Sequence, residues 1–206
     1  MSTTKKHRPW NAEKAVGQMK ALTPDQVETI RRILEQKGDY RGQALFSTAI
    51  DTMLRACDLL KLTVADVTDA DGSVKNEFMV RQKKTGKGVK VTINARTVGA
   101  LEQWINKTGK MMEDWLFTGL RRSKDRAISR EQYRVLVKSW VVYAGLDPVK
   151  FSTHSLRRTK AAHIYNQTQN PEAVRLLLGQ SSITATSRYL GLEQNDAIEL
   201  ARRFEI

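Results

Sequence analysis

The sequence predicts a mainly α-helical protein with one small antiparallel β-sheet, an α+β fold. Over most of the chain, apolar residues recur at helical spacing behind residues that cap helices. Between residues 72 and 93 the period changes to two, because "EFMVRQ" and "VKVTI" are short β-prone runs. The stretch "KKTGKG" between them has the glycine and lysine content of a hairpin turn. A two-stranded hairpin inside a helical chain is therefore expected.

Two helices are predicted ahead of this hairpin. Thr23 and Gln26 form a capping-box pattern, and Pro24 suits the first helical position. Gly38 is the expected stop signal of that helix. A second helix is expected over about residues 41–56, because its apolar residues again fall on one face.

The remaining helices are predicted where capping residues precede apolar periodicity. The expected starts are Asn94 (helix 95–107), the Ser129–Gln132 capping box (helix to about residue 144), Thr153, and Asn170-Pro171 (helix ended by Gly179). The segments "ITATSRYL" and "EQNDAIELARRF" are expected to form the last two helices. Residues 1–21 are basic, polar and weakly patterned, so they are expected to form a flexible arm.

The charge of the chain points to a polyanionic partner. Its 206 residues contain 35 Lys and Arg against 22 Asp and Glu, a formal net charge of +13. Such an excess repels itself in a compact fold, so nucleic acid is the first partner to consider. The sequence predicts neither a membrane span nor a signal peptide, because no apolar run approaches the roughly 18 residues required. The single cysteine, Cys57, suits a reducing cytoplasm.

Most types of catalytic site are disfavoured by the sequence. The three histidines and Cys57 lack metal-ligand spacing, and "TGKG" lacks the remaining positions of a nucleotide-binding loop. Neither a metal nor a cofactor is expected. What remains is a dispersed set of groups that suit a phosphodiester: Arg55, Lys84, His154, Arg157 and Tyr189.

This set contains every group that metal-free phosphodiester chemistry requires. Two guanidiniums can hold the non-bridging oxygens, an ammonium can protonate the departing oxygen, and a phenol can be the nucleophile. Each residue alone also has a plain structural interpretation. His154 could be a helix-cap histidine, Tyr189 a core aromatic residue and Arg55 a helix cap. Lys83 or Lys87 could replace Lys84 as the acid.

Four segments resemble the successive sequence boxes of the tyrosine recombinase (phage integrase) catalytic domain. They are "LRACDLLKLTVADV", "KKTGKGVKVTI", "HSLRRTKAAHIY" and "LLGQSSITATSRYLG", and their order and separations also fit. The resemblance covers about residues 22 to 192, which would then be the catalytic domain. Each box is weak alone, but four in order are a strong signal.

The resemblance implies a role for each matching residue. Arg55 and Arg157 would bind the scissile phosphate, and Lys84 would be the general acid for the 5′-oxygen. His154 would hydrogen-bond the phosphate and assist proton movement, while Tyr189 would attack to give a 3′-phosphotyrosine. Asp58 would support Arg55 without itself contacting the phosphate. Residues 193–206 would form a C-terminal helix that docks onto a neighbouring protomer. The expected assembly is a homo-oligomer, a tetramer, on double-stranded DNA in the bacterial cytoplasm and nucleoid.

Two departures from the family pattern bear on activity. Gln180 stands where the family usually has histidine, or in some members tryptophan. Its amide can donate a hydrogen bond but cannot carry charge, so weakened rather than abolished chemistry is expected. The second departure is that the family's N-terminal core-binding domain is expected to be absent, since only about 20 residues precede the matching segments. The chain resembles the small recombinases that consist of the catalytic domain, some of which invert DNA segments. Weak DNA binding, or help from an accessory DNA-binding protein, is expected.

Three hypotheses for the function follow. The first is a site-specific recombinase that cleaves and rejoins DNA without ATP or metal. The second is a catalytically weakened regulator that occupies DNA sites, with Gln180 as the first sign of decay. The third is a general basic RNA-binding protein, which would leave the spacing of the candidate residues unexplained.

Overall fold

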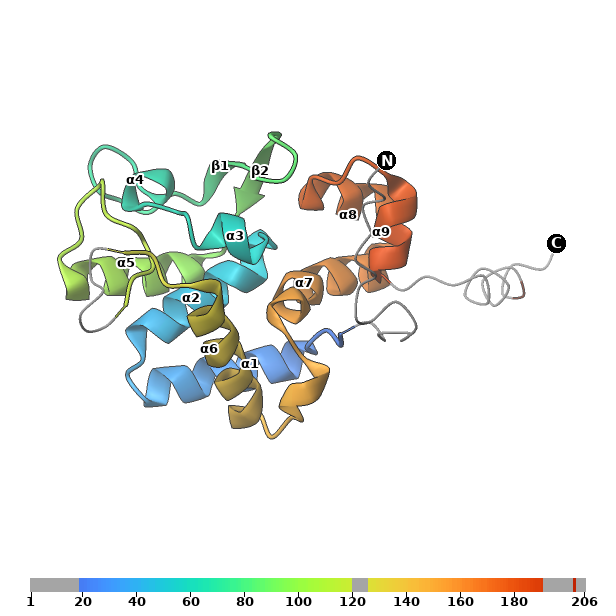
Figure 1. Ribbon diagram of the computed structural model, residues 1–206, viewed down its shortest axis with the longest axis horizontal. Coiled ribbons are helices and arrows are strands. Elements are labelled where there is room, and N and C mark those ends of the chain that lie inside the picture. The colour runs from blue at the N-terminus through green and yellow to red at the C-terminus, as the bar shows by residue number, and fades with distance from the viewer. Residues whose placement is uncertain (1–18, 120–125, 191–201, 203–206) are drawn as a thin grey trace, which may run out of the picture.

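The computed structural model describes residues 19–119, 126–190 and 202 (Figure 1). The helices, in chain order, are α1 (Pro24–Gln36), α2 (Tyr40–Thr52), α3 (Ala56–Leu59), α4 (Val64–Val67), α5 (Ala95–Thr108), α6 (Arg130–Tyr143), the 3-10 turn η1 (Pro148–Lys150), α7 (Thr153–Thr168), α8 (Pro171–Leu178) and α9 (Ile183–Leu190). The strands are β1 (Glu77–Arg81) and β2 (Gly88–Thr92). The predicted α+β fold with a small antiparallel sheet is confirmed.

Helix α2 lies at the centre of the main hydrophobic core. Ala44, Leu45 and Phe46 are fully buried, and α1, α5 and α7 all pack against the helix. A smaller cluster of buried residues, which includes Ala161 of α7 and Val174 of α8, lies beside the main core. In Figure 1 the helices α7, α8 and α9 form the side of the molecule next to the hairpin. The candidate residues come from elements that surround this junction.

Several predicted helix ends are confirmed. The capping boxes that begin at Thr23 and Ser129 are both formed, and the Asn94 side chain accepts a hydrogen bond from the backbone of Thr97. Gly179 adopts φ +61° after α8, which is the left-handed conformation typical of a helix stop. The caps fix these boundaries because they satisfy backbone groups that the helix leaves unpaired.

Two predicted boundaries are wrong. The second helix does not run to residue 56, because Met53 takes a left-handed φ of +51° and ends α2 at Thr52. The chain then starts a separate short helix, α3. At the start of α7 the N-cap is Ser152 rather than Thr153. The Ser152 hydroxyl accepts a hydrogen bond from the backbone N–H of His154, 3.2 Å away.

The hairpin packs one face onto the core. Phe78 pairs with Val91 and Val80 with Val89, and all four side chains are buried while their neighbours along each strand are exposed. This alternation is the period-two pattern that the sequence displays. At the start of the hairpin tip, residues 82–87, Gln82 contacts α8 by donating to the Leu178 carbonyl at 3.0 Å.

A buried carboxylate ties α7 to the centre of the fold. Asp51 of α2 is 4% exposed and accepts a hydrogen bond from the Thr97 hydroxyl at 2.7 Å. The ammonium of Lys160, on α7, lies 3.9 Å from the same carboxylate and donates to the Asp51 carbonyl oxygen at 3.0 Å. Helix α2 leads into Arg55, and helix α7 carries Arg157. These contacts therefore fix the positions of the two arginines relative to each other.

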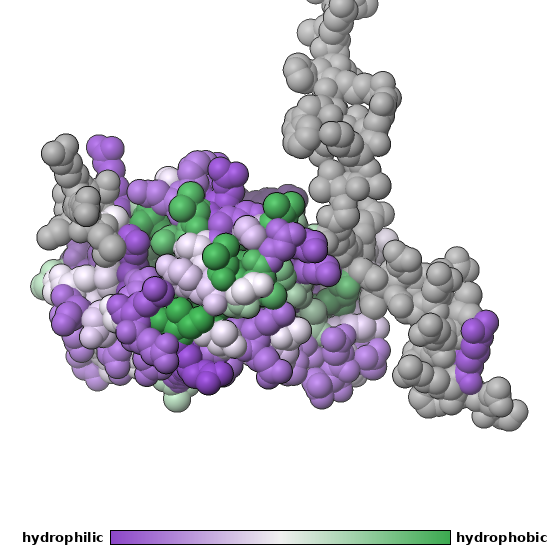
Figure 2. All heavy atoms as spheres, turned by 90° about the horizontal axis from the view of Figure 1, so that it is seen from below, coloured by the Kyte–Doolittle hydropathy of each residue, from purple (hydrophilic) through white to green (hydrophobic). Residues whose placement is uncertain are grey.

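The surface is largely polar with small apolar patches. Figure 2 shows these patches among hydrophilic residues on the side that faces downward in Figure 1. Exposed apolar side chains of α6 and η1 include Val135, Val142 and Val149. In the part of the chain that the structure describes, no helix is long and apolar enough to cross a bilayer. Most of the predicted N-terminal arm (1–21) and of the predicted C-terminal helix (193–206) lies outside the described residues.

Candidate active site

Arg55 lies at the junction between α2 and α3. The left-handed turn at Met53 redirects the chain, and Arg55 becomes the residue that precedes the first turn of α3. Its guanidinium crosses to the hairpin, where Nη1 donates to Oε1 of Gln82 at 2.6 Å. The side chain is half-buried, so part of the guanidinium remains able to meet a ligand.

Arg157 is buried in the first turns of α7. The residue is 3% exposed, and its Nη2 donates to the backbone carbonyl of Leu178 at 3.0 Å. Among the described residues, its Nη1 is buried without a hydrogen-bond partner. Burial lowers the pKa of this guanidinium, and the nearby Arg55 lowers it further. A buried cation with an unused donor is costly unless an acceptor is supplied, and an anion can supply one.

His154 shares a pocket with both arginines. It lies one turn before Arg157 on α7, and the pocket of about 250 Å³ is also lined by Arg55, Cys57 and Arg130. Partial desolvation lowers the pKa of the imidazole, and the charges of Arg157 and Arg55 lower it further. The imidazole is therefore neutral near pH 7 in the free protein and can accept a proton. All the charged residues that line this pocket are cations.

Tyr189 lies on α9 with its ring against the smaller apolar cluster. Met53 and Leu178 belong to that cluster, and the Arg158 guanidinium lies over the ring at 5.7 Å from its centroid. The buried hydroxyl has no hydrogen-bond partner among the described residues. Burial raises the pKa of Tyr189 to about 12, against the opposing effects of Arg157 and Arg158. Tyr189 packs against the cluster that contains Leu178, whose carbonyl accepts a hydrogen bond from Arg157. Tyr189 does not line the pocket of Arg55, His154 and Arg157.

Lys84 lies at the tip of the hairpin, in a neighbouring pocket. That pocket is lined by Lys83 and Lys84 from the hairpin and by Cys57 and Arg130, which also line the pocket of Arg55 and His154. The two pockets therefore share a wall. Lys83 and Lys84 both reach the second pocket, so the choice of Lys84 as the acid stays a prediction, whereas Lys87 lines neither pocket.

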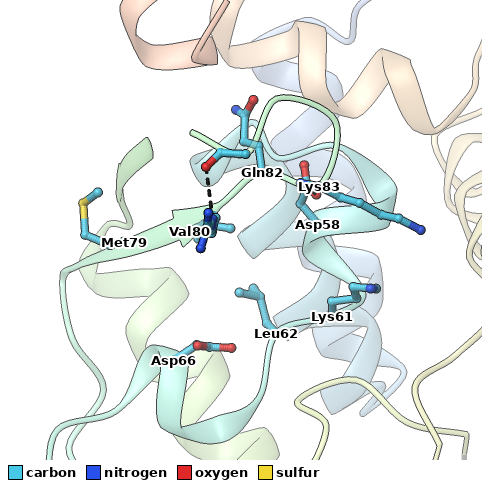
Figure 3. A pocket seen from close by; sticks show the side chains of 10 residues that line it. Asp58, Lys61, Leu62, Asp66, Met79, Val80, Gln82 and Lys83 are labelled. Atoms are coloured by element: carbon cyan, nitrogen blue, oxygen red, sulfur yellow. Dashed lines mark hydrogen bonds between the residues drawn. The ribbon is translucent and has the colours of Figure 1, made fainter. Parts of the chain in front are cut away.

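Asp58 contacts the hairpin instead of Arg55. Its Oδ1 accepts a hydrogen bond from the backbone N–H of Lys83 at 2.9 Å, and among the described residues its Oδ2 is buried without a partner. Asp58 also lines the pocket of about 410 Å³ drawn in Figure 3, together with Lys61 and Lys83. The structure therefore does not bring Asp58 into a hydrogen bond with Arg55; the carboxylate fixes the base of the hairpin turn.

Gln180 is held in the turn between α8 and α9. The hydroxyl of Thr186 donates to its Oε1 at 2.6 Å, and its backbone carbonyl accepts from Arg175 Nη1 at 2.6 Å. With the amide oxygen engaged by Thr186, the NH₂ group is the part of the side chain that can donate to a ligand. It lies close in sequence to both Leu178 and Tyr189, but it lines neither of the pockets that contain Arg55 and Lys84.

Two residues at this site were not predicted from the sequence. Arg130 begins α6 and lines both pockets. Gln82 is only 1% exposed and bonds to Arg55 as well as to the Leu178 carbonyl. A signal for Gln82 was present, because the alternation of β1 assigns this polar residue to the buried face.

The approach of the hairpin to α8 depends on a glycine. A Cβ at Gly179 would clash with Val89 Cγ2 and would lie 2.6 Å from Gln82 Nε2. Gly179→Ala is therefore expected to destabilise the fold by about 2–4 kcal/mol, from left-handed strain and overpacking together. Urea unfolding measures this loss. Gly38→Ala is the matched control, since Gly38 has φ +60° and no atom within 4 Å of its added Cβ. A Gly179→Ala loss no larger than that of Gly38→Ala would contradict the close contact.

The site brings several cations close to one another and to a phenol. Arg55, His154 and Arg157 share one pocket, Lys84 lines the adjoining pocket, and Tyr189 packs against the cluster of Leu178, whose carbonyl accepts from Arg157. Such a site can bind one phosphate group and place a hydroxyl nucleophile beside it. Among the described residues, no group of three or more His, Cys, Asp and Glu side chains could hold a metal ion.

The chain belongs to the phage integrase family. The family model described as "Phage integrase family" matches residues 20–196. A probable integrase/recombinase of Bacillus subtilis, YoeC, is 29% identical over 83% of this chain and 88% of its own length. Tyrosine recombinase XerD of Xanthomonas axonopodis pv. citri is 27% identical over 82% of this chain, but the match spans 57% of that relative.

Solved recombinase structures share the fold. The XerA recombinase superposes with a TM-score of 0.70 at 22% identity, over 97% of this chain and 66% of that chain. The XerH site-specific recombinase bound to its difH substrate gives a TM-score of 0.71 at 20% identity, over 92% of this chain and 56% of that chain. The chain therefore spans little more than half of XerD and XerH. The predicted family and fold are confirmed.

Proposed function

We propose that this protein is a site-specific DNA recombinase that cleaves and rejoins double-stranded DNA through a 3′-phosphotyrosine. The observation that carries the proposal is the cationic pocket shared by Arg55, His154 and Arg157, with Tyr189 packed against the cluster of Leu178, whose carbonyl accepts from Arg157. The net charge of +13 supports DNA as the partner. The relatives named integrase or recombinase support the same class, and XerH was solved with its DNA substrate.

Cleavage would proceed by in-line displacement at phosphorus. The Tyr189 oxygen forms a bond to the scissile phosphorus, the bond to the 5′-oxygen breaks, and the phenolic proton leaves through neutral His154. Arg55 and Arg157 hold the non-bridging oxygens and stabilise the charge that grows on them. Lys84 supplies the proton to the departing 5′-oxygen. Gln180 would donate through its NH₂ group to a phosphate oxygen.

Rejoining would reverse these steps with a 5′-hydroxyl from a partner strand. The phosphotyrosine conserves the energy of the phosphodiester, so the exchange consumes no ATP. Strand exchange between two duplexes uses several protomers, and we propose a tetramer on DNA, in the cytoplasm at the nucleoid. We also propose that an accessory DNA-binding protein assists binding to the site.

The direct test is capture of the covalent intermediate. The binding site is first located by footprinting in the DNA that flanks the gene. The protein is then incubated with a duplex that carries this site and a nick close to the cleavage point, so that the short cleaved fragment diffuses away and rejoining is prevented. A denaturation-resistant protein–DNA adduct is expected, attached through the 3′ end at Tyr189 as mapped by mass spectrometry. Site-specific, salt-sensitive binding without any adduct would overturn the enzyme and favour the regulator.

A further inference from the structure

The two phosphate-binding arginines are joined by one buried glutamine. Gln82 stands at the end of β1, and its Oε1 accepts from Arg55 Nη1 at 2.6 Å. Its Nε2 donates to the backbone carbonyl of Leu178 at 3.0 Å, and Arg157 Nη2 donates to that same carbonyl at 3.0 Å. A continuous chain of three hydrogen bonds therefore runs from one guanidinium to the other. Figure 3 shows Gln82 where the hairpin approaches α8.

The Leu178 carbonyl, at the centre of this series of hydrogen bonds, is well placed to accept two of them. Leu178 is the last residue of α8, and the left-handed Gly179 that follows ends the helix there. Carbonyls at a helix C-terminus lack intrahelical partners and carry the negative end of the helix dipole. The Leu178 oxygen is thus available to accept from a guanidinium and an amide together.

The Gln82 amide also connects two groups of like charge without adding a charge of its own. Arg55 and Arg157 repel each other, which is why Arg55 lowers the pKa of Arg157. No carboxylate bonds to either guanidinium among the described residues, so no permanent anion neutralises them within the hydrogen-bond chain. A neutral amide offers an acceptor to Arg55 and a donor to the Leu178 carbonyl. It fixes both cations while leaving their charge for a ligand.

We infer that Gln82 is a positioning residue that aligns Arg55 and Arg157 on the non-bridging oxygens of the scissile phosphate. The inference rests on the proposed function and deepens it. Gln82 touches neither substrate nor reacting atoms in this role. It acts through the arginines alone.

The test uses Gln82→Leu, and Gln82→Met as a second, unbranched variant of similar length. Both fill the space and remove the hydrogen bonds. Single-turnover cleavage of the native phosphodiester is expected to fall about ten- to a hundredfold, as for misaligned catalytic groups. DNA affinity and Tm should stay near those of the wild type. Gln103→Leu, the same change at an exposed position of α5, is the matched control and should cleave normally.

Two altered substrates separate alignment of the arginines from a merely structural role. A neutral methylphosphonate at the scissile position removes the charge that the arginines stabilise, so the defect of the Gln82 variants should shrink to within about threefold. A 5′-thio leaving group bypasses the general acid, so it should restore Lys84→Ala but leave the Gln82 defect unchanged. Native-level cleavage by both variants, an equal defect on every substrate, or rescue only by the 5′-thio group would overturn the inference.

A binding measurement decides the inference even if the protein cleaves no DNA. Inorganic phosphate should raise the Tm of the wild type and of Gln103→Leu, because it binds the folded protein between the arginines. The shift should be lost in Gln82→Leu and Gln82→Met. An equal shift in all four proteins would overturn the positioning role. Absence of the covalent adduct in the wild type, by contrast, would overturn the proposed function alone.

Discussion

Tyr189→Phe is expected to abolish the covalent protein–DNA adduct while leaving DNA binding and stability unchanged. The substitution removes one oxygen, which makes no hydrogen bond of full geometry among the described residues, so only its weak interaction with the Arg157 guanidinium is lost. The ring keeps its packing against the apolar cluster and under Arg158. Adduct formation is measured on nicked DNA by denaturing gel, and binding by mobility shift at several salt concentrations.

Tyr165→Phe is the matched control. Tyr165 packs against the same apolar cluster from α7, so the variant makes the same chemical change nearby and should form adduct normally. Residual adduct in Tyr189→Phe at the wild-type level would assign the nucleophile to another residue. Loss of adduct in both variants would point to a structural effect.

The pH dependence of wild-type cleavage follows from the same phenol. Because the pKa of Tyr189 is raised to about 12, its hydroxyl is protonated at neutral pH, and the proton must leave as the bond to phosphorus forms. Neutral His154 takes this proton, and desolvation lowers the pKa of its imidazole below the ordinary 6.5. The single-turnover rate should therefore rise with pH only in the acidic range and stay level from about pH 7 to about pH 9.

Arg157→Lys is expected to lower single-turnover cleavage about a hundred- to a thousandfold, the usual effect of losing a donor that stabilises a transition state. Lysine keeps the positive charge but cannot contact the Leu178 carbonyl and a phosphate oxygen with one planar fork. DNA affinity should change far less, because it is the sum of many phosphate contacts. Rapid-quench cleavage and mobility-shift assays separate the two quantities.

A companion variant separates catalysis from folding. Arg157→Met removes a buried cation whose Nη1 has no partner in the described chain, so the free protein should keep or raise its Tm while cleavage is lost. Arg32→Lys, on the exposed face of α1, is the control and should behave as the wild type. A large drop in Tm for Arg157→Met would show that the guanidinium is mainly a structural group.

The predictable part of the fold is the part governed by local chemistry. The sequence predicts the helix caps at Thr23, Asn94 and Ser129, because each of these side chains bonds to backbone groups only a few residues away. It also predicts the stop at Gly179, because glycine adopts the left-handed conformation without strain. The end of α2 could not be predicted, since methionine is not a typical stop residue and yet Met53 adopts a left-handed φ of +51°. Ser152 and Thr153 are equally good caps by sequence, so a one-residue error there is unsurprising.

The candidate site likewise has a part that the sequence predicts and a part that it does not. The order of four sequence boxes predicted the residues that meet at the pocket, and the structure brings Arg55, His154 and Arg157 together. Asp58 was assigned to Arg55, but it bonds to the Lys83 backbone, because a carboxylate on a short helix can reach either group. The Leu178 carbonyl could not be predicted, since backbone acceptors leave no trace in side-chain identity.

In the proposed reaction, the contact between the hairpin tip and α8 would couple the position of the general acid to the position of the nucleophile. Lys84 and Tyr189 flank a single rigid connection formed by Gln82, Leu178 and Gly179. A partner protein or a DNA bend that displaced α9, which carries Tyr189, would therefore also displace Lys84. In the proposed reaction a subunit would then hold both groups in place or neither, so a half-assembled site would not cut DNA.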